Sequence, residues 1–273
     1  PVATMLSGLD GMLQQPCGCF EQTSSSNYPN VMILRFLKQQ AIADPKIMER
    51  AAKLVDDGYK KLVGFETKDK GYEWFGTVPA HEALTAYGLS EFLDMKEIYD
   101  VDSEMVTRTA NWLRTRRDGN GGYKRDPKAL DSFGAASPEV TNAYITYSLT
   151  EAHQNDLEKE IDASAKVASE TKDAYLLALT TSTLLNGGRK QAGSEAAKRL
   201  AAMQEADGGY TKADHSITRS GGTNLHIETT ALALMALLRA GGYDDNVRRG
   251  VEWLTTHRGG FGAWGATQAT VLA

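Results

Sequence analysis

Apolar residues recur along most of the chain at spacings of three and four, the period of an α-helix, and the alternation typical of strands is nearly absent. Stretches rich in Gly, Pro, Ser and Asp divide this pattern into separate segments. The pattern predicts helices over residues 31–40, 46–63, 79–95, 103–116, 139–152, 157–169, 173–185, 194–203, 226–239 and 245–257. Residues 24–27 are predicted as a polar turn, and residues 124–137 and 211–223 as long loops. The sequence therefore predicts an all-α protein.

A short turn motif, in which an aromatic residue follows a glycine, recurs ahead of the apolar helices. It stands at Gly71-Tyr72, Gly122-Tyr123, Gly209-Tyr210 and Gly260-Phe261. An internal repeat of this kind is typical of folds built from one repeated helical unit. Helices that are apolar on all sides alternate with amphipathic ones, which predicts buried inner helices and outer helices that return the chain. We therefore predict an α/α toroid of about six helix pairs in two concentric rings.

In such a toroid the N-termini of the inner helices lie at one end of the molecule. Three carboxylates are predicted in the first turns of these helices, where they interact favourably with the helix dipole: Glu82, Glu139 and Glu228. The same geometry would bring three further polar residues to that end: His81, Asp131 and His226. A histidine at the start of a helix is more often a structural hydrogen-bonding group than a proton carrier, and both interpretations stay open for the two histidines.

Residues 16–22 place the thiol of Cys19 three residues ahead of the carboxamide of Gln22. Residues at i and i+3 face each other on a helical turn. If the sulfur displaces ammonia from Gln22, an internal thioester forms, and its acyl group is activated because a thiolate is a good leaving group. An amine or a hydroxyl can then be captured covalently on the Gln22 carbonyl. A Cys and a Gln at this spacing also occur together by chance.

The residues around this pair read P-x-G-C-x-E-Q and precede an apolar helix. This pattern resembles the thioester domains of the alpha-2-macroglobulin and complement family, which carry G-C-G-E-Q or a close variant. Further similar segments follow in the same order at residues 139–146, 227–231 and 260–271, the first of them one residue shorter than in the family. The chain departs from the family at Phe20, where a small residue is common, and at Cys17. We expect residues 1–273 to be a single thioester domain cut from a larger multidomain protein.

The resemblance implies a single-use covalent trap rather than an enzyme. In the family, cleavage of a bait region elsewhere in the protein exposes the thioester, which then captures the attacking protease. Cys19 would be the leaving group and Gln22 the acyl donor. A loop position of the family selects the nucleophile: histidine relays the acyl group to hydroxyls, whereas Asp or Asn favours amines. Asp131 fits that position if a two-residue gap is allowed, with Asp126 as a competitor, so we predict capture of amines such as protein lysines.

Several residues near the pair have two interpretations each. Candidates for modulating the reaction are Glu21, His81, Asp131 and His226. Candidates for screening the ester from water are Phe20, Tyr72 and Trp74. Core packing is the alternative for the aromatic residues, and it is preferred for all but Phe20. Cys17 either forms a disulfide with Cys19 once that sulfur is freed or is simply buried.

Composition and charge exclude several kinds of partner. The net charge is −5 with both signs interspersed, and no block of Lys and Arg occurs, so neither nucleic acid nor an anionic membrane surface is expected as a partner. No apolar run is long enough to span a membrane. Two cysteines within one tripeptide make a poor metal site, and no cofactor is expected. The lack of an Asn-x-Ser/Thr sequon weakly favours a bacterial parent protein in the periplasm or cell envelope, or secreted.

Two other classes of protein share parts of this pattern. A toroidal enzyme of the prenyltransferase, terpenoid cyclase or glycosidase type is one. A prenyltransferase would need zinc ligands, and a cyclase would need an acidic cluster closer to D-x-D-D than Asp100 and Asp102 are. A glycosidase would need a catalytic pair such as Glu82 and Glu228. A non-covalent binding domain, in which the thioester never forms, is the other. We expect the natural partners to be captured proteases or surface amines, together with neighbouring domains of the parent chain.

Overall fold

The computed structural model describes residues 9–40, 44–128, 133–259 and 267–273. Within these ranges the named elements are all helices, and β-structure is limited to two isolated bridges, Glu66 with Tyr72 and Arg117 with Tyr123. The helices are α2 (Phe20–Gln39), α3 (Pro45–Val63), α4 (Glu82–Lys96), α5 (Ser103–Thr115), α6 (Pro138–Glu151), α7 (Glu158–Glu170), α8 (Ala174–Asn186), α9 (Lys190–Ala202), α10 (Gly222–Ala240), α11 (Asp244–Thr256) and α12 (Thr267–Leu272). The prediction of an all-α chain is confirmed.

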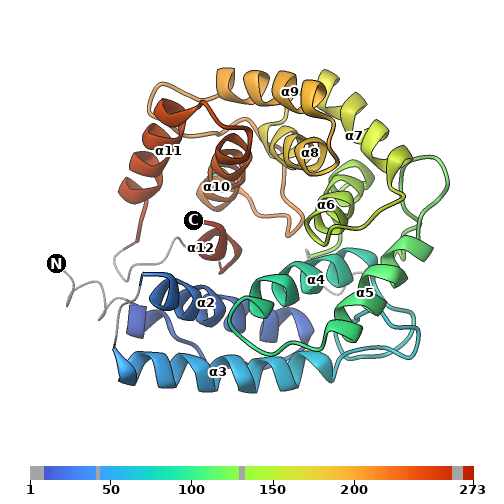
Figure 1. Ribbon diagram of the computed structural model, residues 1–273, viewed down its shortest axis with the longest axis vertical. Helices are drawn as coiled ribbons and strands as arrows, with labels where there is room; N and C mark the ends of the chain where they lie inside the picture. The colour runs from blue at the N-terminus through green and yellow to red at the C-terminus, as the bar shows by residue number, and fades with distance from the viewer. Residues whose placement is uncertain (1–8, 41–43, 129–132, 260–266) are drawn as a thin grey trace.

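The even-numbered helices contact one another in a closed cycle. Helix α2 contacts α4, α4 contacts α6, and the series continues through α8 and α10 to α12, which returns to α2. The odd-numbered helices lie outside this cycle (Figure 1). Helices α3, α5, α9 and α11 each pack mainly on the inner helix that precedes them, whereas α7 packs mainly on α8, which follows it. Inner helices such as α8 are buried on nearly every side, whereas outer helices such as α11 bury one stripe. The alternation of apolar and amphipathic helices in the sequence thus corresponds to an alternation of inner and outer positions.

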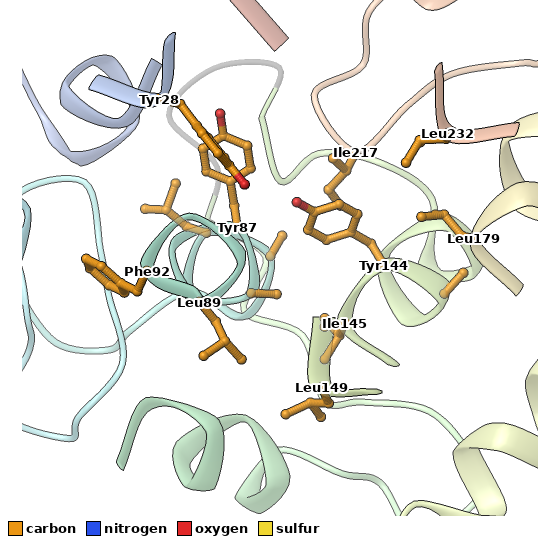
Figure 2. Packing of buried hydrophobic residues seen from close by; sticks show 14 of the residues in the cluster. Tyr28, Tyr87, Leu89, Phe92, Tyr144, Ile145, Leu149, Leu179, Ile217 and Leu232 are labelled. Atoms are coloured by element: carbon orange, nitrogen blue, oxygen red, sulfur yellow. The ribbon is translucent and has the colours of Figure 1, made fainter. Parts of the chain in front are cut away.

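Large side chains fill the space between neighbouring inner helices. Figure 2 shows Tyr28 from α2, Tyr87 from α4 and Tyr144 from α6 among the aliphatic residues of this core. The rings of Tyr28 and Tyr87 lie edge to face with centroids 6.1 Å apart. Ile217, from the segment between α9 and α10, packs beside Tyr144. The core between the inner helices therefore also includes a residue of the connection between α9 and α10.

The repeated turn motif has a packing explanation. At Gly209, an added Cβ would lie 2.6 Å from Cε2 of Trp253, a residue of the outer helix α11. The indole of Trp253 donates to Asp207 at 3.1 Å, and the backbone N–H of Tyr210 donates to Thr230 of the inner helix α10 at 3.0 Å. The glycine is therefore required because a tryptophan ring lies flat against the turn. These bonds tie one turn to an inner and an outer helix.

The first copy of the turn repeats these contacts. An added Cβ at Gly71 would lie 2.8 Å from Cδ2 of Trp112 in α5, and Trp112 donates to Asp69 at 3.3 Å. The backbone N–H of Tyr72 donates to Thr85 of α4 at 2.9 Å. The copies at Gly71 and Gly209 thus share a glycine, an aspartate, a threonine and a tryptophan. The copy at Gly122 differs: an added Cβ there would meet Asn142 and Asp118, and the backbone N–H of Tyr123 donates to Asn142 at 3.2 Å. The copy at residues 260–261 lies outside the described residues.

The predicted first boundary of α2 is wrong. The helix begins at Phe20, so residues 24–27, predicted as a polar turn, lie inside it. Ser24, Ser26 and Asn27 are buried, and two of them bond to another helix: Asn27 donates to Glu91 of α4 at 2.9 Å, and Ser24 donates to the same carboxyl group. Tertiary partners therefore make a helix of a stretch whose local preference is for a turn. Pro29, which usually ends a helix, is also inside α2 and buried.

Three further helix starts and one short helix differ from the prediction. Helix α4 begins at Glu82 rather than at residue 79. Helix α10 begins at Gly222 rather than at residue 226, and α9 begins at Lys190 rather than at residue 194. The periodicity did not predict α12, which is only one and a half turns long. Most of the missed residues are small or polar, which makes the apolar period hard to recognise at these helix starts.

Replacing Gly209 by Ala tests the packing explanation of the repeat. The added methyl group would overlap the Trp253 ring, so we expect the free energy of unfolding to fall by about 1–3 kcal/mol. Urea unfolding followed by circular dichroism measures the change. Gly221→Ala is the matched control, because nothing lies within 4 Å of a Cβ at that position. Equal effects of the two substitutions would contradict the explanation.

Candidate functional site

The fold places Cys19 and Gln22 together on the first turn of α2. Cys19 is the N-cap of the helix, with φ −73° and ψ −178°, and Gln22 is its third residue. The two form a capping box, in which the backbone N–H of Cys19 donates to Oε1 of Gln22 at 3.2 Å and the Cys19 side chain faces the backbone N–H of Gln22. The thiol and the carboxamide predicted to react are therefore brought to the same helical turn, on the side that solvent reaches: Gln22 is exposed and Cys19 is half-buried.

Gly18 provides the space that this arrangement requires. A Cβ at position 18 would lie 2.8 Å from Cδ of Gln22 and 2.0 Å from its Oε1. Gly18 also has φ +85°, in the region that favours glycine. Both observations show that the carboxamide of Gln22 folds back over the glycine, so any other residue at position 18 would displace it.

Hydrogen bonds fix the chain on both sides of the pair. The backbone N–H of Phe20 donates to the carbonyl of Trp74 at 2.9 Å, and the indole N–H of Trp74 donates to Glu21 at 2.9 Å. On the preceding side, the hydroxyl of Thr23 donates to the carbonyls of Cys17 at 3.2 Å and Gly18 at 3.3 Å. The pair is therefore held by the turn at residues 71–76 and by α2 itself.

The aromatic residues near the pair lie beneath it. Phe20 is 0 % exposed; its ring lies 4.9 Å from that of Tyr72, and a Cβ on Gly88 of α4 would come 2.5 Å from its tip. Tyr72 and Trp74 are also buried. Since Gln22 is exposed, these rings form the floor of the site and anchor the start of α2 in the core. Their predicted role in screening the ester from water stays a prediction.

His81 packs against Trp74, whose carbonyl accepts the backbone N–H of Phe20 next to the pair. It is the N-cap of α4, its Nδ1 accepts the backbone N–H of Leu84 at 3.5 Å, and its ring lies 5.0 Å from that of Trp74. Its Nε2 has no hydrogen-bond partner, although the side chain is only 4 % exposed. Burial lowers the pKa of His81, so the ring is neutral near pH 7. The structural interpretation, a helix cap, is observed; a role in proton transfer stays a prediction.

The other predicted modulating residues have different positions. His226 lies half-buried in α10, and α12 separates α10 from α2 in the helix cycle, so no described contact joins it to the pair. Asp131 lies outside the described residues. Its competitor Asp126 lines a pocket of about 240 Å³ together with Trp74 and His81. The choice between Asp131 and Asp126 as the residue that selects the nucleophile therefore stays open.

The three glutamates predicted in first turns have three different environments. Glu82 is buried in the first turn of α4, is ion-paired with Arg116 at 2.7 Å and accepts the backbone N–H of Asp126 at 2.9 Å. Glu139 is exposed in the first turn of α6. Glu228 lies well inside α10, so its predicted position is wrong, and it is buried and accepts from Ser220. Burial raises the pKa of Glu228 to about 7.

Glu91 is a buried carboxyl group that the sequence analysis missed. It is 0 % exposed between α2 and α4 and accepts from Asn27 and Ser24, both close to the pair in α2. Burial raises its pKa to about 8, so the group is protonated at neutral pH. The sequence did contain a signal, because Glu91 interrupts a helix that is otherwise apolar on the corresponding face.

Comparison with known proteins assigns the chain to a family. The A-macroglobulin TED domain matches residues 2–273, and the chain belongs to this family. It is similar to thioester-containing protein 1 allele R1 of Anopheles gambiae, with 25 % identity over 281 residues, which is 99 % of this chain and 20 % of that protein. Allele S3 of the same protein is 25 % identical over 279 residues, or 98 % of this chain and 20 % of that protein. The chain thus spans about a fifth of the length of these relatives.

Metal binding and membrane spanning are two further possibilities for the part of the chain that the structure describes. There, no group of three or more His, Cys, Asp or Glu side chains is arranged to hold a metal ion. In the same residues, no helix is both long and apolar enough to cross a membrane.

Replacing Glu91 by Gln tests the buried carboxyl group. Its pKa is about 8 in the folded chain against an ordinary value of 4.5, so the folded state binds this proton more tightly. The resulting stabilisation is complete below pH 4.5 and is lost as the pH rises towards 8. We therefore expect the stability of the wild type to fall, relative to Glu91→Gln, by up to about 1.4 kcal/mol per pH unit across that window.

Urea unfolding at several pH values gives this difference directly. Glu139→Gln, at an exposed position, controls for the loss of one carboxyl group from an inner helix. Parallel stability profiles for the wild type and Glu91→Gln would show that Glu91 is not protonated in the folded chain.

Proposed function

We propose that the chain captures nucleophiles covalently through an internal thioester between Cys19 and Gln22. The observation that carries this proposal is the capping box between Cys19 and Gln22. It holds the carboxamide of Gln22 over Gly18, on the same turn as the Cys19 side chain. Attack of the sulfur on the Gln22 carbonyl expels ammonia and forms the thioester. A nucleophile then attacks the same carbonyl, and the sulfur of Cys19 leaves as a thiolate. The family of the chain supports this chemistry.

The reaction consumes the site, so the proposed role is a trap and not an enzyme. Once the Gln22 carbonyl has formed an amide with a target, the site is spent, because an amide resists attack by the released Cys19 thiol better than an ester does. In this proposal the chain is one α/α-toroid domain, of about six helix pairs, within a macroglobulin-like protease inhibitor. Cleavage of that inhibitor exposes the thioester to lysines of the protease. The share of the relatives that the chain covers supports a longer parent protein.

Neighbouring domains of the parent protein have a specific part in this proposal. Gln22 is exposed, whereas the rings of Phe20, Tyr72 and Trp74 are buried in the core. A thioester at this position would therefore be open to water in the chain alone. We propose that a neighbouring domain covers it until activation. We also propose that the parent protein is periplasmic, held in the cell envelope, or secreted.

We further propose that the captured nucleophile is an amine. The sequence of the loop at residues 126–134 supports this choice, because it contains Asp126 and Asp131 and no histidine. His81 packs edge to face against Trp74, but its Nδ1 caps α4. Glu21, bonded to Trp74, orients the first turn of α2 in this proposal.

The intact mass of freshly prepared protein, with and without methylamine, tests the proposal. We expect the initial mass to fall short of the sequence mass by one ammonia. Methylamine should then raise it by one methylamine as one new thiol appears. Cys19→Ser and Gln22→Ala should show the full sequence mass and no incorporation. Cys17→Ser should behave like the wild type, because Cys17 takes no part in the ester.

The result is interpreted through the state of residue 22. A full sequence mass with no methylamine uptake, in both this chain and its parent protein, would refute the thioester. A mass corresponding to Glu at position 22 would show instead that the ester formed and was then hydrolysed. Peptide mapping of residue 22 separates these two outcomes.

Substitution of Asp131 by His tests the choice of nucleophile. A histidine that accepts the acyl group would pass it to hydroxyls, so we expect capture of glycerol relative to methylamine to rise by at least about tenfold, within the range of positioned general bases. Incorporation of labelled glycerol and methylamine measures the ratio. Asp126→His is the matched comparison. A rise with Asp126→His alone would transfer the role to Asp126, and no rise with either would refute selection by this loop.

A further inference from the structure

Cys17 is an exposed thiol two residues from the reacting cysteine. Free cysteines are among the most frequently buried side chains of proteins, so packing does not account for this one. Burial, one of the two interpretations left open by the sequence, is therefore wrong. Metal binding is not supported either, because the described residues contain no suitable group of three ligands.

The backbone around Cys17 is fixed rather than free. Its N–H donates to the hydroxyl of Ser26 at 3.4 Å, and its carbonyl accepts from Thr23 at 3.2 Å. On the other side of Gly18, Cys19 caps α2, and the next backbone N–H, that of Phe20, is bonded to Trp74. Both cysteines are thus attached to the same two turns of α2.

The spacing of the two cysteines suits a disulfide. Successive Cα atoms are about 3.8 Å apart, so Cα atoms two residues apart are separated by at most about 7.6 Å. The chain bends at Gly18 and Cys19, and Gly18 has φ +85°, which shortens this separation. Disulfides span about 4.4–6.8 Å between Cα atoms. Glycine between the cysteines also provides the backbone freedom that a ring of this size needs.

We propose that Cys17 forms a disulfide with Cys19 after the thioester has opened. The disulfide removes the Cys19 thiolate, which could otherwise attack the captured product and release it. This rests on the proposed function. While the thioester is intact, the sulfur of Cys19 is acylated and Cys17 is the sole free thiol of the chain. Capture of a nucleophile releases the Cys19 thiol, and only then are both partners available. The disulfide can therefore form only in molecules whose thioester has already reacted.

The oxidant is a small-molecule disulfide of the glutathione type. The thiolate of Cys17 attacks it, which gives a mixed disulfide and releases one thiol. The thiolate of Cys19 then attacks the sulfur of Cys17 and releases the second thiol. Two protein thiols are oxidised by two electrons in total, and one external disulfide is reduced to two thiols. The Gln22 adduct takes no part in either step.

The consequence concerns the reverse reaction. After capture, the Cys19 thiolate remains on the turn that also carries the Gln22 carbonyl, where it can attack an ester product and regenerate the thioester. An amide product resists this attack better than an ester. In the disulfide, the sulfur of Cys19 is no longer a thiolate and cannot attack the Gln22 carbonyl. An ester product is therefore protected from this reverse reaction for as long as the disulfide persists.

The test follows thiols and mass in the wild-type protein. Methylamine should raise the number of titratable thiols from one to two, and excess oxidised glutathione should then lower it to zero. The final mass should be lower by two hydrogens, without bound glutathione. Peptide mapping should locate the bond between Cys17 and Cys19, in at least about tenfold excess over glutathione adducts, as expected for a high effective concentration.

Two single-thiol variants provide matched controls. Cys17→Ser after methylamine should end with one glutathione on Cys19, and Cys19→Ser with one glutathione on Cys17. Glutathione adducts on the wild type, or two thiols that persist in oxidised glutathione, would overturn the proposal. If methylamine is never incorporated, the proposed function fails separately. Both thiols are then free from the start, and the oxidation of the wild type still decides whether they pair.

Discussion

The packing of Phe20 against the gap at Gly88 determines where α2 begins. A side chain on Gly88 would occupy the position of the Phe20 ring, so the aromatic residue of the motif and the glycine of α4 depend on each other. With the ring buried, the backbone N–H of Phe20 meets the carbonyl of Trp74, and Cys19 becomes the N-cap. The capping box and the position of Gln22 follow. The geometry of Cys19 and Gln22 thus depends on a hydrophobic contact in the core.

The same region contains an unusual polar interaction between α2 and α4. Burial of an ionised carboxylate would be costly, and Glu91 is instead protonated and bonded to Ser24 and Asn27. A neutral acid in this position needs partners of defined geometry, and these lie one and two turns from Cys19. The hydrogen bonds of Ser24 and Asn27 to Glu91 therefore fix both the rotation of α2 about its axis and its position along that axis. Apolar packing alone is less specific. A further close contact, between Asn27 and Gly58 of α3, fixes the third side of the helix.

The sequence predicted the helices and the reacting pair for identifiable reasons. Helix α8 and most of α10 are apolar on nearly every side, outer helices such as α3 and α11 have a clear amphipathic period, and the repeated turns mark the ends of the units. Cys19 and Gln22 were singled out because the residues around them resemble the motif of the family, since a Cys and a Gln at this spacing also occur together by chance. The start of α2 could not be predicted, since Ser24 and Asn27 favour turns locally and become helical only against Glu91. Glu228 was misplaced for a related reason: two glycines hid the first turn of its helix.

Closure of the helix cycle by α12 has a consequence for the order of folding. The contact between α12 and α2 joins residues 267–272 to residues 20–39, so it closes a loop of nearly the whole chain. Contacts of such long separation form late, because the entropy of loop closure opposes them. One flank of α2, the helix that carries Cys19 and Gln22, consequently stays uncovered until the last helix has been synthesised. A reactive acyl bond on that helix would be safest if it formed after this step, which makes maturation of the site dependent on completion of the fold.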